Sequence, residues 1–96
     1  MFASAPELAA QAYADAFDVE PSVAALHGWL LALARDDAPG GGRERVAEAA
    51  RQGVGTLRRD NRIVTGEAQD RALDALGAAV GTEALVDAVT ALVETL

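Results

Sequence analysis

Apolar residues recur every three or four positions along most of this 96-residue chain, and this spacing restricts its fold more than any other feature. The clearest case is the segment from Glu83 to Leu96, where one side of a helix would carry Leu85, Val86, Val89, Leu92, Val93 and Leu96. The polar residues of this segment fall on the other side, as in a helix that packs one face against a core. No segment alternates apolar and polar residues for long, so the pattern predicts an all-α protein.

Capping signals divide the chain into an expected bundle of four to five helices. Ser4 and Glu7 have the spacing of a capping box, which predicts a helix from about residue 4 to residue 17. Its apolar positions at helical spacing are Leu8, Ala12, Ala16 and Phe17. A second helix is expected over about residues 20–35, and Ser22 near its start is interpreted as a cap or turn residue. Thr65 and Thr82 supply cap signals for a fourth and a last helix.

The middle of the chain is rich in glycine. Residues 36–42, DDAPGGG, predict a flexible loop between the second and third helices. A third helix is expected from about Arg43, but Gly53 and Gly55 each cost about 1 kcal/mol inside a helix, so we expect it to kink or end there. We expect one domain over residues 1–96, with the last helix packed against the second.

The composition excludes several kinds of functional site. The chain has no cysteine, which rules out disulfides, thiolate metal ligands and cysteine nucleophiles. Its single histidine, His27, cannot form a histidine metal cluster within one chain, so we expect no metal site and no cofactor. No apolar run approaches the ~20 residues that span a bilayer, and the N-terminus lacks the regions of a secretory signal. We therefore expect a cytoplasmic protein with no membrane contact.

Charge is distributed unevenly along the chain. The formal net charge is −7, yet residues 35–62 hold seven arginines and five acids. One interpretation is a DNA-binding helix-turn-helix over residues 46–62, because the alanine and glycine spacing before Gly53 resembles its turn. However, Arg59 occupies the position where that motif has a buried apolar residue, and an acidic protein gains little from counterion release. Nucleic acid is therefore the less favoured partner.

The alternative for Arg58, Arg59 and Arg62 is a solvated surface that pairs with acids of the chain or of a partner. Arginine forms forked hydrogen bonds to carboxylates, which suits such a bridging role. Exposed pairs contribute only ~0–1 kcal/mol each. Replacing the three arginines by glutamine is therefore expected to leave the melting temperature nearly unchanged.

Residues 62–96, RIVTGEAQDRALDALGAAVGTEALVDAVTALVETL, resemble the last two helices of the carboxymuconolactone decarboxylase and alkylhydroperoxidase-like superfamily. The resemblance covers just over a third of the chain and consists of Ala, Leu and Val at helical spacing around a glycine-containing turn. It implies an oligomeric all-helical protein. Peroxidase-type members use a Cys-x-x-Cys pair with a nearby His and Glu. This chain has no cysteine, so no catalytic residue is carried over.

Three functions remain open at this point. The leading hypothesis is a protein-interaction or homo-oligomerisation module without catalysis, because a small chain that is 51% hydrophobic holds more apolar surface than one core covers. Its expected contact residues are Arg58, Arg59, Arg62, Leu85, Val89, Leu92 and Leu96. The first alternative is a cysteine-free enzyme or ligand-binding protein with a helical pocket near Trp29, where His27 is the candidate catalytic residue. The second is DNA binding through residues 46–62.

Overall fold

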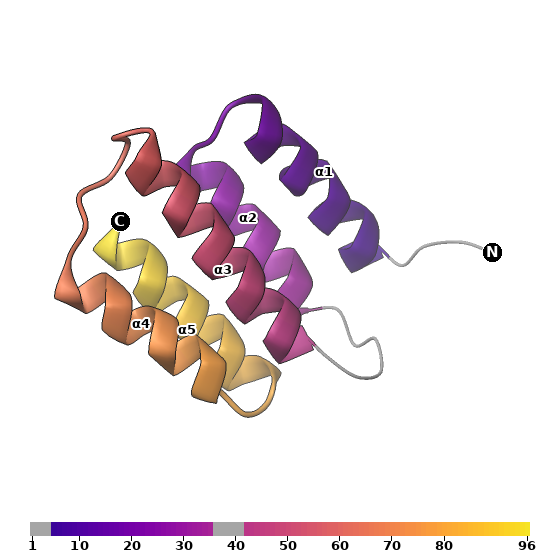
Figure 1. Cartoon of the computed structure of the whole chain (residues 1–96). Coiled ribbons are helices and arrows are strands. Elements are labelled where there is room, and N and C mark those ends of the chain that lie inside the picture. Colours follow the sequence, from indigo (N-terminus) through magenta and orange to yellow (C-terminus); the bar gives the residue numbers. More distant parts are fainter. Residues whose placement is uncertain (1–4, 36–41) are drawn as a thin grey trace.

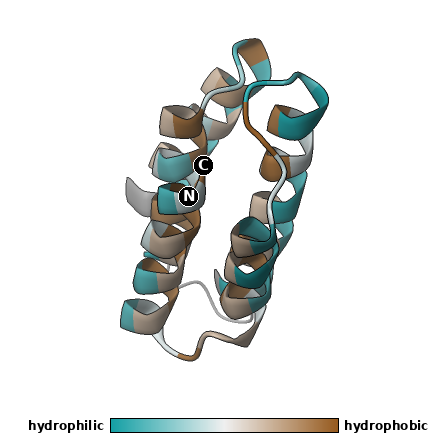
Figure 2. Cartoon of the chain, turned by 90° about the vertical axis from the view of Figure 1, so that its left-hand side faces the viewer, coloured by the Kyte–Doolittle hydropathy of each residue, from teal (hydrophilic) through white to brown (hydrophobic). Residues whose placement is uncertain are grey.

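The computed structural model describes residues 5–35 and 42–96, and these form helices α1 (Ala5–Val19), α2 (Val23–Ala34), α3 (Gly42–Arg59), α4 (Glu67–Ala78) and α5 (Thr82–Thr95). Successive helices run in opposite directions (Figure 1). The ring helices lie in two layers (Figure 2), with α3 and α4 in front of α2 and α5 in the view of Figure 1. The all-α prediction is confirmed, and the described residues contain no strand. Ser4 and residues 36–41 of the expected loop lie outside the described residues.

Four of the helices enclose the core. Helix α2 packs against α3 and α5, and α4 packs against the same two helices, so these four form a closed ring. The contact between α2 and α5 confirms the predicted packing of the last helix. Helix α1 lies outside the ring, where it packs against α2 (Figure 1).

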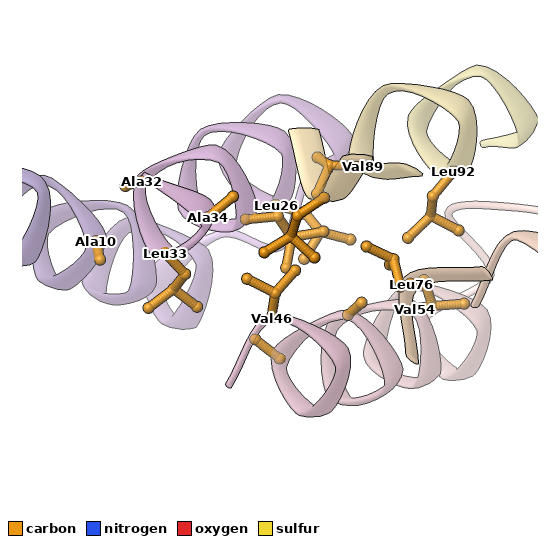
Figure 3. Close-up of a cluster of buried hydrophobic side chains, with 14 of the residues drawn as sticks. Ala10, Leu26, Ala32, Leu33, Ala34, Val46, Val54, Leu76, Val89 and Leu92 are labelled. Carbon is orange, nitrogen blue, oxygen red and sulfur yellow. The ribbon is translucent and has the colours of Figure 1, made fainter. Parts of the chain in front are cut away.

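The interior of the ring is filled by aliphatic side chains from all four helices. Leu26 lies near its middle, with Val46 of α3, Leu76 of α4 and Val89 of α5 around it (Figure 3). Fully burying such a side chain contributes about 1.5–3 kcal/mol. The largest side chains that are almost entirely inaccessible are Leu26, Leu30, Val46, Val54, Leu57, Leu76, Val89 and Leu92.

Helix α3 continues without interruption through Gly53 and Gly55, so the expected kink or end is wrong. The reason lies in the packing of α3 against α2. A methyl group at Gly53 would overlap Cδ1 of the buried Leu26, so the glycine allows the two helices to approach closely. This close packing of α3 against α2 outweighs the local cost of about 1 kcal/mol for glycine in a helix.

The starts of the helices follow the predicted caps only in part. Ser22 caps α2, because its Oγ accepts a hydrogen bond from the Ala25 amide at 3.1 Å. The N-cap positions of α4 and α5 are Gly66 and Gly81, neither of which offers a capping side chain. The caps expected from the neighbouring threonines are therefore wrong. Gly81 has a φ of 91°, which glycine adopts readily because it has no Cβ.

Candidate functional site

The arginine-rich segment forms the C-terminal half of α3 and the turn after it. The helix ends in a Schellman motif, in which the Arg62 amide donates to the Leu57 carbonyl at 2.9 Å and the Asn61 amide donates to the Arg58 carbonyl at 3.1 Å. Asn61 has a left-handed φ of 57°, as this motif requires. Asparagine tolerates that conformation better than most residues.

The helix-turn-helix alternative over residues 46–62 needs a turn near Gly53. Helix α3 is continuous from Gly42 to Arg59, so the geometry contradicts this alternative. The arginines of this segment therefore belong to one helix and its exit, and no separate recognition helix begins after Gly53.

The structure separates the three arginines that were expected to act together. Arg58 donates from Nε and Nη2 to Oε1 of Gln69, at 3.0 and 2.8 Å, and from Nη2 to Oδ1 of Asp70 at 2.9 Å. Its side chain is only 25% exposed. Arg59 and Arg62 are exposed, and within the described residues their side chains form no ion pair. Arg58 therefore joins α3 to α4, in agreement with the expected pairing of these arginines with acids of the chain.

Gln69 is the centre of the polar network and was not among the residues predicted from the sequence. It is 3% exposed, and its Nε2 donates to the Val64 carbonyl at 2.5 Å and to the Thr95 carbonyl at 3.4 Å. One amide thus links α3, the connection before α4, α4 itself and the end of α5. Gln69 lies three residues before the buried Ala72, on the same face of α4. This spacing was the feature of the sequence that could have indicated its burial.

The apolar contact residues predicted on the last helix lie inside the molecule. Leu85 is 5% exposed, and Val89 and Leu92 are inaccessible in the core. Leu96 packs against the same core and is partly buried. These side chains are used within the chain, because α5 closes the ring of four helices. Leu85, Val89 and Leu92 therefore offer almost no surface to a partner, whereas Leu96 stays partly exposed.

The pocket expected near His27 and Trp29 stays a prediction, because neither residue lines the two surface hollows described below. His27 is half-buried on α2 and makes no hydrogen bond or ion pair with any described residue. Trp29 packs against Phe17 of α1, with ring centroids 5.9 Å apart. Two surface hollows lie elsewhere, one lined by Arg43, Glu44, Ala47, Glu48, Arg51 and Gly77 and the other by Arg58, Asn61, Arg62, Ile63, Val64 and Thr65. Over residues 5–35 and 42–96, no cluster of acids and histidine could hold a metal.

Helix α1 carries apolar residues on two opposite sides. Ala10 and Phe17 are buried on the side that faces α2. The other side, which we call the outer face of α1, consists of the exposed residues Leu8, Ala12, Ala16 and Val19. Their spacing of three and four residues aligns them along one side of the helix. Leu8 is 59% exposed and Val19 is 87% exposed.

This arrangement corrects the apolar face expected for the first helix. Leu8, Ala12 and Ala16 were expected to share a face with Phe17, but Phe17 points to α2 and the other three point to solvent. In this orientation the Phe17 ring packs against Trp29 of α2, a contact between aromatic side chains that the other orientation of α1 would lose.

Acidic residues surround the outer face. The segment from Glu7 to Glu20 holds four acids and no basic residue. Asp15, Asp18 and Glu20 are exposed and form no hydrogen bond or ion pair through their side chains in the part of the chain that the structure describes. This edge of the bundle therefore combines exposed apolar side chains with unneutralised negative charge.

Comparison of the chain with models of protein families, with curated proteins and with solved structures finds no match. The resemblance of residues 62–96 to the carboxymuconolactone decarboxylase and alkylhydroperoxidase-like superfamily stays a prediction. Among the described helices, none is both long and apolar enough to cross a membrane.

Proposed function

We propose that this chain is a helical protein-interaction module whose docking surface is the outer face of α1. The observation that carries the proposal is the row of exposed apolar side chains from Leu8 to Val19, on the side of α1 opposite its contact with α2. Single exposed apolar residues are common on protein surfaces. Four of them aligned on one helix form a continuous apolar strip, which is typical of a binding site.

The dimensions of α1 suit the docking of another helix. A helix of 15 residues is about 22 Å long. Helices that dock on a groove or on another helix use anchors at the spacing seen here, three and four residues apart. Burying Leu8 and Val19 against a partner would remove from water apolar area that is exposed in this structure.

Both versions of the interaction hypothesis, homo-oligomerisation and docking of a different protein, can use this face. In a homo-oligomer, two α1 helices would pair across a two-fold axis, so that each outer face covers the other. In a hetero-complex, a helix of another protein would occupy the same position. On α5, by contrast, Leu85, Val89 and Leu92 lie in the core.

The proposal predicts that photo-crosslinking through α1 is specific to its outer face. With p-benzoylphenylalanine in place of Ala12, we expect a covalent adduct of defined mass in cells that make the protein. The same group in place of Ala75, an exposed alanine of α4, is the matched control and is expected to give little adduct. Mass spectrometry of the adduct distinguishes a second copy of the chain from another protein.

The double variant Leu8→Ser with Val19→Ser is expected to abolish the Ala12 adduct without unfolding the protein. Both side chains are exposed, so their replacement changes the free energy of unfolding by only about 0.5 kcal/mol. Thermal unfolding followed by circular dichroism checks this point. Equal crosslinking from positions 12 and 75, or an adduct that persists in the double variant, would contradict the proposal.

A further inference from the structure

The chemistry of the outer face of α1 also indicates its partner, provided that the proposed docking function holds. We infer that the outer face of α1 binds an amphipathic helix of another protein whose apolar strip is flanked by Lys or Arg. The inference rests on the charges that border the strip and on the sizes of the side chains within it.

Acidic residues lie along both edges of the strip. Asp15 is three residues after Ala12 and four before Val19, so its carboxylate lies beside the strip. Glu20 is four residues after Ala16, and its amide donates a helical hydrogen bond to the Ala16 carbonyl at 3.0 Å. The backbone is therefore still helical at Glu20, which places its carboxylate beside the other edge of the strip. A docked helix with basic residues beside its own apolar strip would neutralise both carboxylates. Such charge complementarity sets partner choice and association rate.

A second copy of the chain fits this face less well. Two α1 helices paired antiparallel would bring their Asp15 carboxylates toward each other near the centre of the contact, and like charges placed so are unfavourable. Each copy also carries a net charge of −7, which adds repulsion at longer range.

The arginine-rich helix of a second copy does not fit either. The exposed arginines of α3 alternate with Glu44 and Glu48. None of the exposed large apolar residues in the described part of the chain lies on α3. A second copy can therefore supply positive charge through α3 but no apolar strip to cover Leu8 and Val19.

The side-chain sizes indicate how a helix would sit on α1. Leu8 and Val19 lie at the two ends of the strip, and Ala12 and Ala16 lie between them. The strip covers about three helical turns, or roughly 17 Å. A large apolar residue of the partner can reach the α1 backbone at the two alanines, and Leu8 and Val19 can pack on either side of it. The expected partner motif is therefore a central Leu, Met or Phe with smaller or aliphatic residues one turn away.

The experiment titrates the natural protein with a fluorescent synthetic peptide of about 15 residues, or four helical turns. The peptide has Leu along one helical face and Lys beside it. A control peptide keeps the Leu face and carries Glu in place of Lys. We expect the Lys peptide to bind at least tenfold more tightly than the Glu peptide at about 0.15 M salt, and its affinity to fall as salt is added.

Protein variants then locate the binding. Asp15→Asn with Glu20→Gln is expected to weaken the Lys peptide about threefold to tenfold. Leu8→Ser with Val19→Ser is expected to weaken it at least tenfold. The matched control is Asp74→Asn with Asp87→Asn, which removes two exposed acids from α4 and α5 and should leave the affinity within about twofold.

The outcomes separate this inference from the proposed function. If the Glu peptide binds as tightly as the Lys peptide and both depend on Leu8 and Val19, docking on α1 stands and the basic partner is refuted. An Ala12 adduct that proves to be a second copy of the chain refutes it as well. If the control variant weakens the Lys peptide as much as the α1 variant does, or if the Lys peptide fails to bind, the inference is overturned.

Discussion

At the scale of single residues, the polar pair Arg58 and Gln69 contributes more to the bundle than the sequence indicates. The Oε1 of Gln69 accepts two hydrogen bonds from the Arg58 guanidinium, and its Nε2 donates to two backbone carbonyls. Loss of a partner from a buried polar group costs about 1–3 kcal/mol, because the group stays desolvated. In the described residues, no buried side-chain nitrogen or oxygen lacks a partner.

We therefore predict that Arg58→Ala lowers the free energy of unfolding by about 1–3 kcal/mol, whereas Arg59→Ala changes it little. Arg59 is the matched control, because it lies next along α3 but is exposed. In a Gln69→Leu background the Arg58→Ala loss should shrink, since no buried Oε1 is left unpaired. Urea unfolding of the natural protein, the three single variants and the double variant measures these free energies. If Arg58→Ala and Arg59→Ala lowered the free energy of unfolding equally, the contact of Arg58 with Gln69 would not stabilise the protein. The expectation that replacing the arginines leaves the melting temperature nearly unchanged would then hold.

At the scale of secondary-structure elements, α3 shows how packing decides whether glycine breaks a helix. Two glycines lie two residues apart in the same helix, and their surroundings differ. Gly53 contacts the buried Leu26, but no side chain lies within 4 Å of where a Cβ at Gly55 would be. The first glycine is needed for the approach of α3 to α2, and the second carries only the conformational cost of glycine.

The two alanine substitutions should consequently have opposite effects. Gly55→Ala is expected to raise the free energy of unfolding by about 0.5–1 kcal/mol, through helix propensity alone. Gly53→Ala is expected to lower it by about 1 kcal/mol or more, because the methyl group displaces Leu26 in a packed core. Chemical unfolding of both variants under the same conditions measures the difference. A stabilised Gly53→Ala protein would mean that α2 and α3 do not touch at this point.

At the scale of the whole molecule, the flat shape leaves α1 outside the ring, where its main contact among the described residues is α2. The Cα trace measures 41 × 30 × 16 Å, and the short dimension corresponds to two layers of helices. Each helix of the ring packs against two others of the ring, whereas α1 packs against α2. Among the side chains of α1 that the structure describes, only Ala10 and Phe17 are buried. Segments with few buried apolar side chains open at lower free energy than the rest of a protein.

Amide hydrogen exchange is therefore expected to be faster in α1 than in α2, α4 and α5 under native conditions. A docked helix on the outer face would add a neighbour, so binding of the Lys peptide should slow exchange in α1 and leave α4 unchanged. Exchange measured by mass spectrometry, with and without peptide, tests both statements. Protection of α1 as strong as that of α2 in the free protein would contradict this account of the fold.

The sequence alone determined the fold class, the approximate position of each helix and the buried face of α5. These features are local, because the spacing of apolar residues and the Ser22 cap act within a few turns of one helix. The sequence also excluded cysteine chemistry and a histidine metal cluster by composition. It placed the expected apolar contact residues on α5 and not on the outer face of α1, because periodicity does not show which apolar face a neighbouring helix covers.

Only the tertiary structure decided which apolar residues face solvent. Leu85, Val89 and Leu92 are buried because α5 closes a ring with α2 and α4, and Leu8 and Val19 are exposed because α1 lies outside that ring. Arg58 became a structural residue through Gln69, eleven positions further along the chain. Each of these outcomes depends on a neighbour contributed by another helix. Periodicity within one helix shows that apolar faces exist, but the assembly of the helices determines which face is covered.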